Sequence, residues 1–480
     1  MRPVESFDAF VKKPRLARWS QVFRSCLMTG TVLAAGFASS APASAQTLTE
    51  ALVMTYQSNP EILAQRAALR AADENIPAAE GAWRPAVSAT LSSGVTNVDS
   101  ESNGINSPAG TSYPQTGTLS VSQPIYTGGA GDAALASSEA DVQAQRASMF
   151  SVEQSVLLSA VSAYVDVIQA QSTFELQITN VERLEKQLQA TRDRFRVGEV
   201  TRTDVAQAES RLARANADRT SAEGNLVTAR VEFERVVGSV PTNLTQPAVA
   251  SNLPSNRETT VDLAVADNFL LIRQKYIEES ARADVDSALS NLYPTLDLVG
   301  EAQYAKDSSG GDNRTTSVSA ELQLVIPIYQ RGVQYANVRN SKETLNQQRL
   351  TTDQQRRAVV DSAASTFESY KTTLAGIESI KSEVQSAEIA LDGVQQEATV
   401  GARTVLDVLD AEQELLDAQV RLVQANRDAI VASYQLLVTI GRLTARDLAL
   451  PVEIYDYDAH YRQVRGKWFG TEPVGRLPGN

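Results

Sequence analysis

Residues 400–411 read Val-Gly-Ala-Arg-Thr-Val-Leu-Asp-Val-Leu-Asp-Ala, and a related stretch, Arg-Val-Gly-Glu-Val-Thr-Arg-Thr-Asp-Val, occupies residues 196–205. In each stretch a Val-Gly pair precedes an Asp-Val pair, and the two copies stand 203 positions apart. At the same offset, Gln-Pro-Ile-Tyr at 123–126 matches Ile-Pro-Ile-Tyr at 326–329. A constant offset over more than a hundred residues indicates two structural repeats.

Each repeat contains two segments in which apolar and polar side chains alternate with the period of a β-strand. The clearest sets Val318, Ala320 and Leu322 against Ser319 and Glu321. The expected strands cover about 84–98 and 116–126 in the first repeat, and about 293–306 and 315–329 in the second. About ten residues suffice for a tilted strand to cross a bilayer. A soluble sandwich with one wet face has the same alternation, so the pattern alone leaves both readings open.

Long helices are expected after the second strand of each repeat. No proline interrupts residues 131–196 or 332–399. Apolar side chains recur every seven residues, which favours antiparallel coiled-coil hairpins. One such row is Leu409, Leu416, Val423, Ile430 and Leu437. The expected long helices are 131–196, 203–238, 332–400 and 404–441, with hairpin turns at the two Val-Gly pairs.

The chain begins with a segment that has the order of a secretory signal peptide. Basic residues such as Lys12 and Arg24 come first, an apolar run from Leu27 to Ala38 follows directly after Cys26, and small residues end at Ala45. An N-terminal membrane anchor is the alternative, although the run is shorter than the about 20 residues that span a bilayer. The expected organisation is a signal peptide at 1–45, a first repeat at 46–258, a second at 259–441, and a partly flexible periplasmic segment at 442–480.

Composition excludes several classes of function. Without residues 1–45 the chain keeps 38 Lys and Arg against 55 Asp and Glu, which argues against nucleic acid as a partner. The single cysteine, Cys26, lies in the expected signal peptide, and His460 is the only histidine. No catalytic triad, thiolate nucleophile or histidine-rich metal site is expected, so the sequence predicts neither an enzyme nor a bound cofactor or metal.

The expected strands are too few to close a barrel in one chain. The smallest membrane barrels have about eight strands, and open sheet edges are not tolerated in lipid. If the strands lie in a membrane, several chains related by cyclic symmetry must share one barrel. Three chains would supply twelve strands and six helical hairpins. The sequence therefore predicts an α+β membrane protein, a homotrimer whose twelve-stranded β-barrel continues into a periplasmic α-helical barrel.

With these features, the mature sequence from Leu48 to about Leu450 resembles the TolC family of outer-membrane efflux and secretion channels. Residues 400–411 and 196–205 carry the most specific likeness, to the two hairpin tips of that family. The resemblance implies an exit duct in the outer membrane, with its helices in the periplasm. It also implies three kinds of partner: a periplasmic adaptor protein, an inner-membrane ABC or RND-type transporter, and the outer-membrane lipid.

The resemblance also implies a gate at the periplasmic end of the duct. The matching residues are Thr203 and Asp204 on the first tip and Arg403 on the second, where Asp204 would accept a charge-assisted hydrogen bond from Arg403. Helix capping and a solvated surface pair are the plainer alternative. The family's best-known pattern has a tyrosine where Ala398 stands here, which removes one expected gate contact.

Two acids and two turns complete the expected site. Asp407 and Asp410 share a helix face, and in a trimer each would form a carboxylate ring at the constriction, unless they simply favour the helix N-terminus. The tips at Val197, Gly198, Val400 and Gly401 are expected to dock the adaptor, although glycine also suits any tight turn. Tyr126 and Tyr329 fit either an aromatic girdle or packing at the strand-to-helix junction.

Two other classes of protein compete with a channel. A periplasmic adaptor also uses helical hairpins, but it would be expected to have one hairpin flanked by soluble β-domains. A secreted structural coiled coil would not need four alternating strands.

Overall fold

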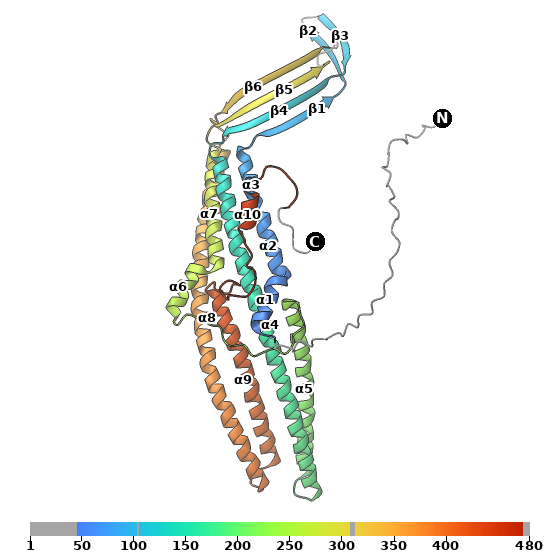
Figure 1. The fold of residues 1–480 in the computed structure, drawn as a ribbon, viewed down its shortest axis with the longest axis vertical. Helices are drawn as coiled ribbons and strands as arrows, with labels where there is room; N and C mark the ends of the chain where they lie inside the picture. The colour runs from blue at the N-terminus through green and yellow to red at the C-terminus, as the bar shows by residue number, and fades with distance from the viewer. Residues whose placement is uncertain (1–45, 103–104, 308–312, 474–480) are drawn as a thin grey trace, which may run out of the picture. The chain divides into compact units, whose positions relative to one another are not determined.

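The structure, a computed structural model, describes residues 46–102, 105–307 and 313–473. The expected signal peptide at 1–45 and the last seven residues of the expected C-terminal segment lie outside the described residues. The elements, drawn in Figure 1, are α1 (Leu48–Ser58), α2 (Pro60–Asp73), α3 (Asn75–Glu80), η1 (Gly81–Trp83), β1 (Ala86–Ser93), β2 (Thr96–Ser102), β3 (Ile105–Ser112), β4 (Gln115–Tyr126), α4 (Ala130–Arg196), α5 (Arg202–Val237), α6 (Arg257–Asp267), α7 (Phe269–Ser290), β5 (Thr295–Lys306), β6 (Arg314–Val325), α8 (Val333–Thr399), α9 (Val405–Thr439) and α10 (Ala459–Val464).

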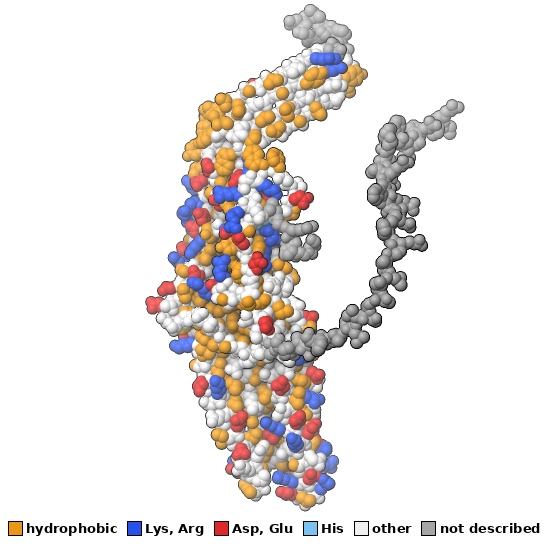
Figure 2. All heavy atoms as spheres, viewed as in Figure 1, with side chains coloured by type: hydrophobic (Ala, Val, Ile, Leu, Met, Phe, Trp, Pro, Cys, Tyr) orange, Lys and Arg blue, Asp and Glu red, His pale blue; other side chains and the backbone are white. Residues whose placement is uncertain are grey.

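Four strands form one antiparallel sheet in the order β1-β4-β5-β6. The first and last of these strands are edges, since neither pairs on its outer side with another strand of the described residues. All side chains of β1 and β6 are exposed. Figure 2 shows hydrophobic side chains spread over this sheet, whereas charged side chains gather over the helices.

The remaining two strands were expected to be part of a loop. Instead, β2 and β3 form a separate antiparallel hairpin beyond β1 and β4. The predicted first strand, 84–98, is therefore divided near Gly94, whose N–H donates to the carbonyl oxygen of Pro114 at 3.0 Å. Because Pro114 has no N–H to return, the ladder of β1 and β4 ends there and a second hairpin starts.

The long helices lie beside one another in the same order as the strands. Helix α4 packs against α2 and α5 on one side and against α7 and α9 on the other, while α8 packs against α7 and α9 (Figure 1). Helices α4 and α8 each contain 67 residues. The two repeats thus supply four columns: α2 with α5, then α4, then α7 with α9, then α8.

An asparagine joins the two helices of each composite column. Asn59 caps the start of α2 and donates from Nδ2 to the carbonyl oxygen of Val236 in α5, at 3.0 Å. Asn268 caps α7 and donates in the same way to Thr439 of α9, also at 3.0 Å. The carbonyl groups at a helix end lack partners within their own helix, so each amide satisfies one of them.

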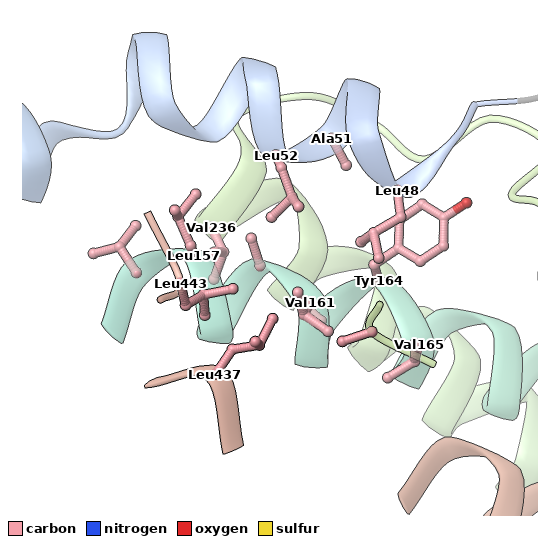
Figure 3. Packing of buried hydrophobic residues seen from close by; sticks show 14 of the residues in the cluster. Leu48, Ala51, Leu52, Leu157, Val161, Tyr164, Val165, Val236, Leu437 and Leu443 are labelled. Atoms are coloured by element: carbon pink, nitrogen blue, oxygen red, sulfur yellow. The ribbon is translucent and has the colours of Figure 1, made fainter. Parts of the chain in front are cut away.

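The largest hydrophobic cluster lies where these helix ends meet α4. Figure 3 shows Leu48, Ala51 and Leu52 of α1 facing Leu157 and Val161 of α4, and α5 and α9 contribute Val236 and Leu437. This cluster fixes the first helix and the ends of both hairpins to one long helix. An 18-residue window of α4 is apolar enough by composition to cross a membrane, but 56% of it is buried, as expected for a core helix.

Tight contacts fix the junctions between sheet and helices. Gly128 has a φ of +67°, and a Cβ there would lie 2.8 Å from the carbonyl oxygen of Ser290. A Cβ on Gly131 would meet the Trp83 ring at 2.7 Å. Only glycine fits at these positions, where β4 passes into α4 beside the end of α7.

Candidate functional site

The first hairpin tip connects α4 to α5 through a short turn. Val197 ends α4, and Gly198 takes a φ of +80°, which glycine adopts without steric cost. Thr201 then caps α5, and the carboxylate of Asp204 accepts hydrogen bonds from the N–H and the hydroxyl of Thr201, both at 2.8 Å. Asp204 is thus held by its own helix start.

The second tip repeats this geometry between α8 and α9. Gly401 has a φ of +76°, and Thr404 caps α9. Asp407 accepts from the N–H of Thr404 at 2.9 Å and from its hydroxyl at 2.8 Å. These hydrogen bonds hold the pKa of the Asp407 carboxyl below its usual value, with a smaller contribution from Arg403. Asp407 is therefore ionised at neutral pH.

The expected gate residues do not meet within one chain. The ion pairs of the described residues do not join Asp204 with Arg403, because Arg403 pairs with Glu397 at 2.7 Å. Thr203 lies exposed beside Asp204, and Ala398 contributes its carbonyl oxygen to the turn, accepting from Gly401 N.

Asp410 takes part in a pair that the sequence did not predict. Its carboxylate accepts from Nη2 of Arg211 at 2.6 Å, which joins α9 of one hairpin to α5 of the other. The two residues are 199 positions apart, and no periodic pattern in the sequence relates them. Asp410 is also partly exposed, so this pair is screened by water and is open to exchange with other partners.

A second unpredicted group is Glu412, two residues further along α9. Its side chain is only 6% exposed, and its Oε2 has no hydrogen-bond partner among the described residues. Burial raises the pKa of Glu412, and the charge of Arg183 opposes that rise. Glu209, its counterpart in the first repeat, is exposed and accepts from Arg192 at 2.7 Å. The repeat pattern relates the two acids but does not reveal that one is buried.

Glu412 lies at the wall of a groove between the hairpins. Helix α4 lines this groove with Arg183, Lys186 and Arg194, and α8 lines it with Glu388 and Asp392. The groove thus brings basic side chains of α4 and acidic side chains of α8 to one place beside the buried carboxylate of Glu412.

Comparisons with known proteins identify the family. The model of the family described as "Outer membrane efflux protein" matches residues 51–239 and 261–442. The chain belongs to the outer membrane efflux protein family. It is 36% identical to the outer membrane efflux protein BepC of Brucella suis over 471 residues, which cover 95% of this chain and 99% of BepC. It is 26% identical to the outer membrane protein TolC of Escherichia coli, over 83% of this chain and 84% of TolC.

Solved structures share the fold. The CmeC outer membrane channel of Campylobacter jejuni superposes with a TM-score of 0.75 at 14% identity, covering 87% of this chain and 89% of CmeC. These findings confirm the predicted resemblance to the TolC family. The protein is a channel component of the outer membrane that serves as an exit duct for efflux or secretion, and it is not an enzyme. The adaptor and coiled-coil alternatives are therefore set aside.

Proposed function

We propose that three copies of this chain form one tunnel, with a shared twelve-stranded barrel in the outer membrane and a helical barrel in the periplasm. The observation that carries the proposal is the open sheet with two exposed edges, β1 and β6. Unpaired backbone groups cost several kcal/mol each in lipid, so each edge needs a partner strand. Cyclic pairing of β6 with β1 of the next chain provides one.

The helices support the same assembly. Among the four columns, α8 packs chiefly against α7 with α9, and α2 with α5 packs chiefly against α4, with a smaller contact between α5 and α9. Large apolar side chains remain exposed on both outer columns, including Val227 and Val231 on α5 and Leu350 and Ile389 on α8. Exposed apolar side chains of this kind mark interaction surfaces. If α8 of one chain packs against α2 and α5 of the next, these apolar side chains are covered. The same arrangement of chains pairs β6 of the first chain with β1 of the next.

In this tunnel the hairpin tips form the periplasmic gate. Asp204 and Thr203 of one chain would face Arg403 of another, so Arg403 would exchange Glu397 for Asp204 when the gate closes. Asp407 and Asp410 would each form a ring of three carboxylates at the constriction, a geometry that favours cations. Because Ala398 has no side-chain donor, the closed state depends on these ionic contacts.

The exposed turns are the proposed docking points for the partners. Val197 and Val400 lie exposed at the two tips, each followed by a glycine at positive φ. A periplasmic adaptor would bind these turns and connect the duct to an inner-membrane ABC or RND-type transporter. An apolar side chain at the centre of each turn suits a small hydrophobic contact.

Cysteine cross-linking between sheet edges tests the assembly. The mature chain has no native cysteine if residues 1–45 are removed, so the engineered cysteines are the only thiols that a cross-linker can join. Ala89→Cys on β1 is combined in turn with a cysteine at Val318, Ala320 or Leu322 on β6, which share its face of the sheet. A short bifunctional maleimide should give covalent dimers and trimers and no larger species for at least one pair. Monomers only, or a ladder beyond three, would contradict the proposal, and single-cysteine variants are the control.

A further inference from the structure

An exposed aromatic pair follows α10 near the end of the described chain. Trp468 is 57% exposed and Phe469 is 87% exposed, although both are large apolar side chains. Their rings lie 6.4 Å apart between centroids. Exposure of two adjacent large aromatic side chains is unfavourable in water, which makes this pair a candidate contact surface.

The pair is fixed in place by the residues that lead into the sheet. Arg84 donates from Nη1 to the carbonyl oxygen of Lys467 at 2.7 Å, and its guanidinium lies 5.0 Å from the Trp468 ring centroid. Arg84 also pairs with Glu80 at 2.7 Å, and Glu80 accepts from the N–H of Gly466 at 3.2 Å. Since β1 begins at Ala86, these contacts hold the pair beside the base of the first strand.

The chain before the pair is packed rather than loose. Val464 is fully buried, and the ring of His460 lies 3.0 Å from the carboxylate of Asp73 in α2. Tyr461 and Tyr457 lie against the guanidinium of Arg146 in α4. Contacts with α2, α3 and α4 therefore hold Trp468 and Phe469 in position.

The base of the sheet is the level at which a bilayer interface is expected. Exposed tyrosines mark the other strand ends there: Tyr126 at the end of β4, Tyr293 before β5 and Tyr329 after β6. Tryptophan and tyrosine favour the membrane–water interface, where an aromatic ring contacts acyl chains while its polar group stays hydrated.

Arg465 and Lys467 precede the pair. Arg465 lies 3.9 Å from the carboxylate of Glu80, and Lys467 donates from Nζ to the carbonyl oxygen of Glu472 at 3.1 Å. Exchange of these contacts would let both cations bind the phosphate groups of phospholipids.

We propose that Trp468 and Phe469 insert into the periplasmic leaflet of the outer membrane, where they bind phospholipid at the base of β1. The inference rests on the strands of the sheet crossing that membrane, and it does not require a particular number of chains. The C-terminal segment then anchors the helices to the membrane from outside the barrel. Phospholipid is favoured over a second copy of the chain for two reasons. The aromatic pair lies at the level of the strand ends, where a bilayer interface is expected, and basic side chains lie next to it.

Depth-dependent fluorescence quenching tests the proposal. The sequence has three tryptophans, and one of them, Trp19, lies in the expected signal peptide. The mature Trp83→Phe variant therefore contains Trp468 alone, and it is reconstituted in lipid nanodiscs with a quencher either on the phospholipid headgroup or deep in the acyl chain. Trp468 emission should be quenched most by the shallow label, and Phe469→Ser should reduce that quenching.

Two outcomes would overturn the inference. Trp468 emission that no lipid label quenches, at a wavelength typical of water, would mean that the pair stays in solvent. Unquenched emission at a short wavelength would mean that protein, such as a second copy, covers it. A fluorophore on Val318→Cys of β6 is the positive control. If lipid labels do not quench that fluorophore either, the sheet is not in the bilayer. The proposal that the strands cross the membrane would then be wrong, and the inference about Trp468 would fail with it.

Discussion

At the level of single residues, the tips combine acids in three different environments. Asp204 and Asp407 cap their own helices, Asp410 pairs across the hairpins with Arg211, and Glu412 is buried with one oxygen unpartnered. Acidic side chains at the tips thus have three roles. They cap helices, they form an exchangeable ion pair, and one of them has a protonation state that is linked to stability.

We expect multivalent cations to block the channel through Asp407 and Asp410. Replacing both with Ala should weaken the block in planar-bilayer recordings, since the two carboxylate rings disappear. Arg211→Ala should have the opposite effect, because it frees the Asp410 carboxylate from its partner at 2.6 Å. Block that is unchanged in both variants would show that these carboxylates are not at the constriction. Glu209→Ala, which removes an exposed acid of the first hairpin, is the matched control.

Glu412 should make the helical tips more stable in mild acid. Its pKa is raised in the folded state, so the folded chain holds this proton more tightly than the unfolded chain. Its contribution therefore favours folding more as the pH falls through the raised pKa toward the ordinary pKa of a glutamic acid, and the advantage is lost as the pH rises through the raised pKa. Glu412→Gln should reduce this pH dependence in denaturant unfolding. An equal slope in Glu412→Gln and wild type would contradict the assignment, and Glu209→Gln is the control.

The sequence located part of the tip chemistry. The motif placed Asp204, Asp407 and both glycines in the turns, because local capping requires those residue types at that spacing. It did not reveal Arg211 or the burial of Glu412, since both depend on how the hairpins pack. The gate contact between Asp204 and Arg403 remains a prediction.

At the level of elements, the ends of the hairpins are the points where the two repeats join. Each composite column depends on an asparagine that caps one of its helices and on a glycine with positive φ that follows the other, Gly238 after α5 and Gly441 after α9. Gly441 is the tighter of the two glycines, because a Cβ there would lie 2.1 Å from the carbonyl oxygen of Asp267. At Gly238 the nearest atom is the mobile hydroxyl of Ser58, at 3.3 Å.

Gly441→Ala should consequently destabilise the chain much more than Gly238→Ala. Both substitutions place alanine at a positive φ, which costs about 1 kcal/mol. Only Gly441→Ala also forces backbone atoms apart at the α6–α7 connection, where a loss of several kcal/mol is typical of strain at such a site. Thermal unfolding of the two variants measures the difference. Equal losses of stability would contradict the close approach at Asp267.

The elements themselves were largely predictable from sequence. The long helices begin and end within about two residues of the expected bounds, since heptads, missing prolines and Val-Gly turns act locally. The β2–β3 hairpin was missed because its Gly, Ser and Asn content is typical of a loop. The β2–β3 segment forms a hairpin through backbone pairing, which amino-acid composition does not predict.

At the level of the whole molecule, one chain is an incomplete structure. Its sheet ends in two exposed edges, and its outer helical columns carry exposed apolar side chains. The sequence predicted this incompleteness from the number of strands alone, because a membrane barrel must close. In the proposed trimer, the contacts between chains would cover these edges and side chains.

Native mass spectrometry of the mature protein, released from detergent micelles, tests the central claim most directly. If three chains share one barrel, the dominant species should have the mass of three chains and should resist dissociation until the detergent is replaced by denaturant. A dominant species with the mass of one chain, under conditions in which the β-sheet remains folded, would contradict the trimeric tunnel.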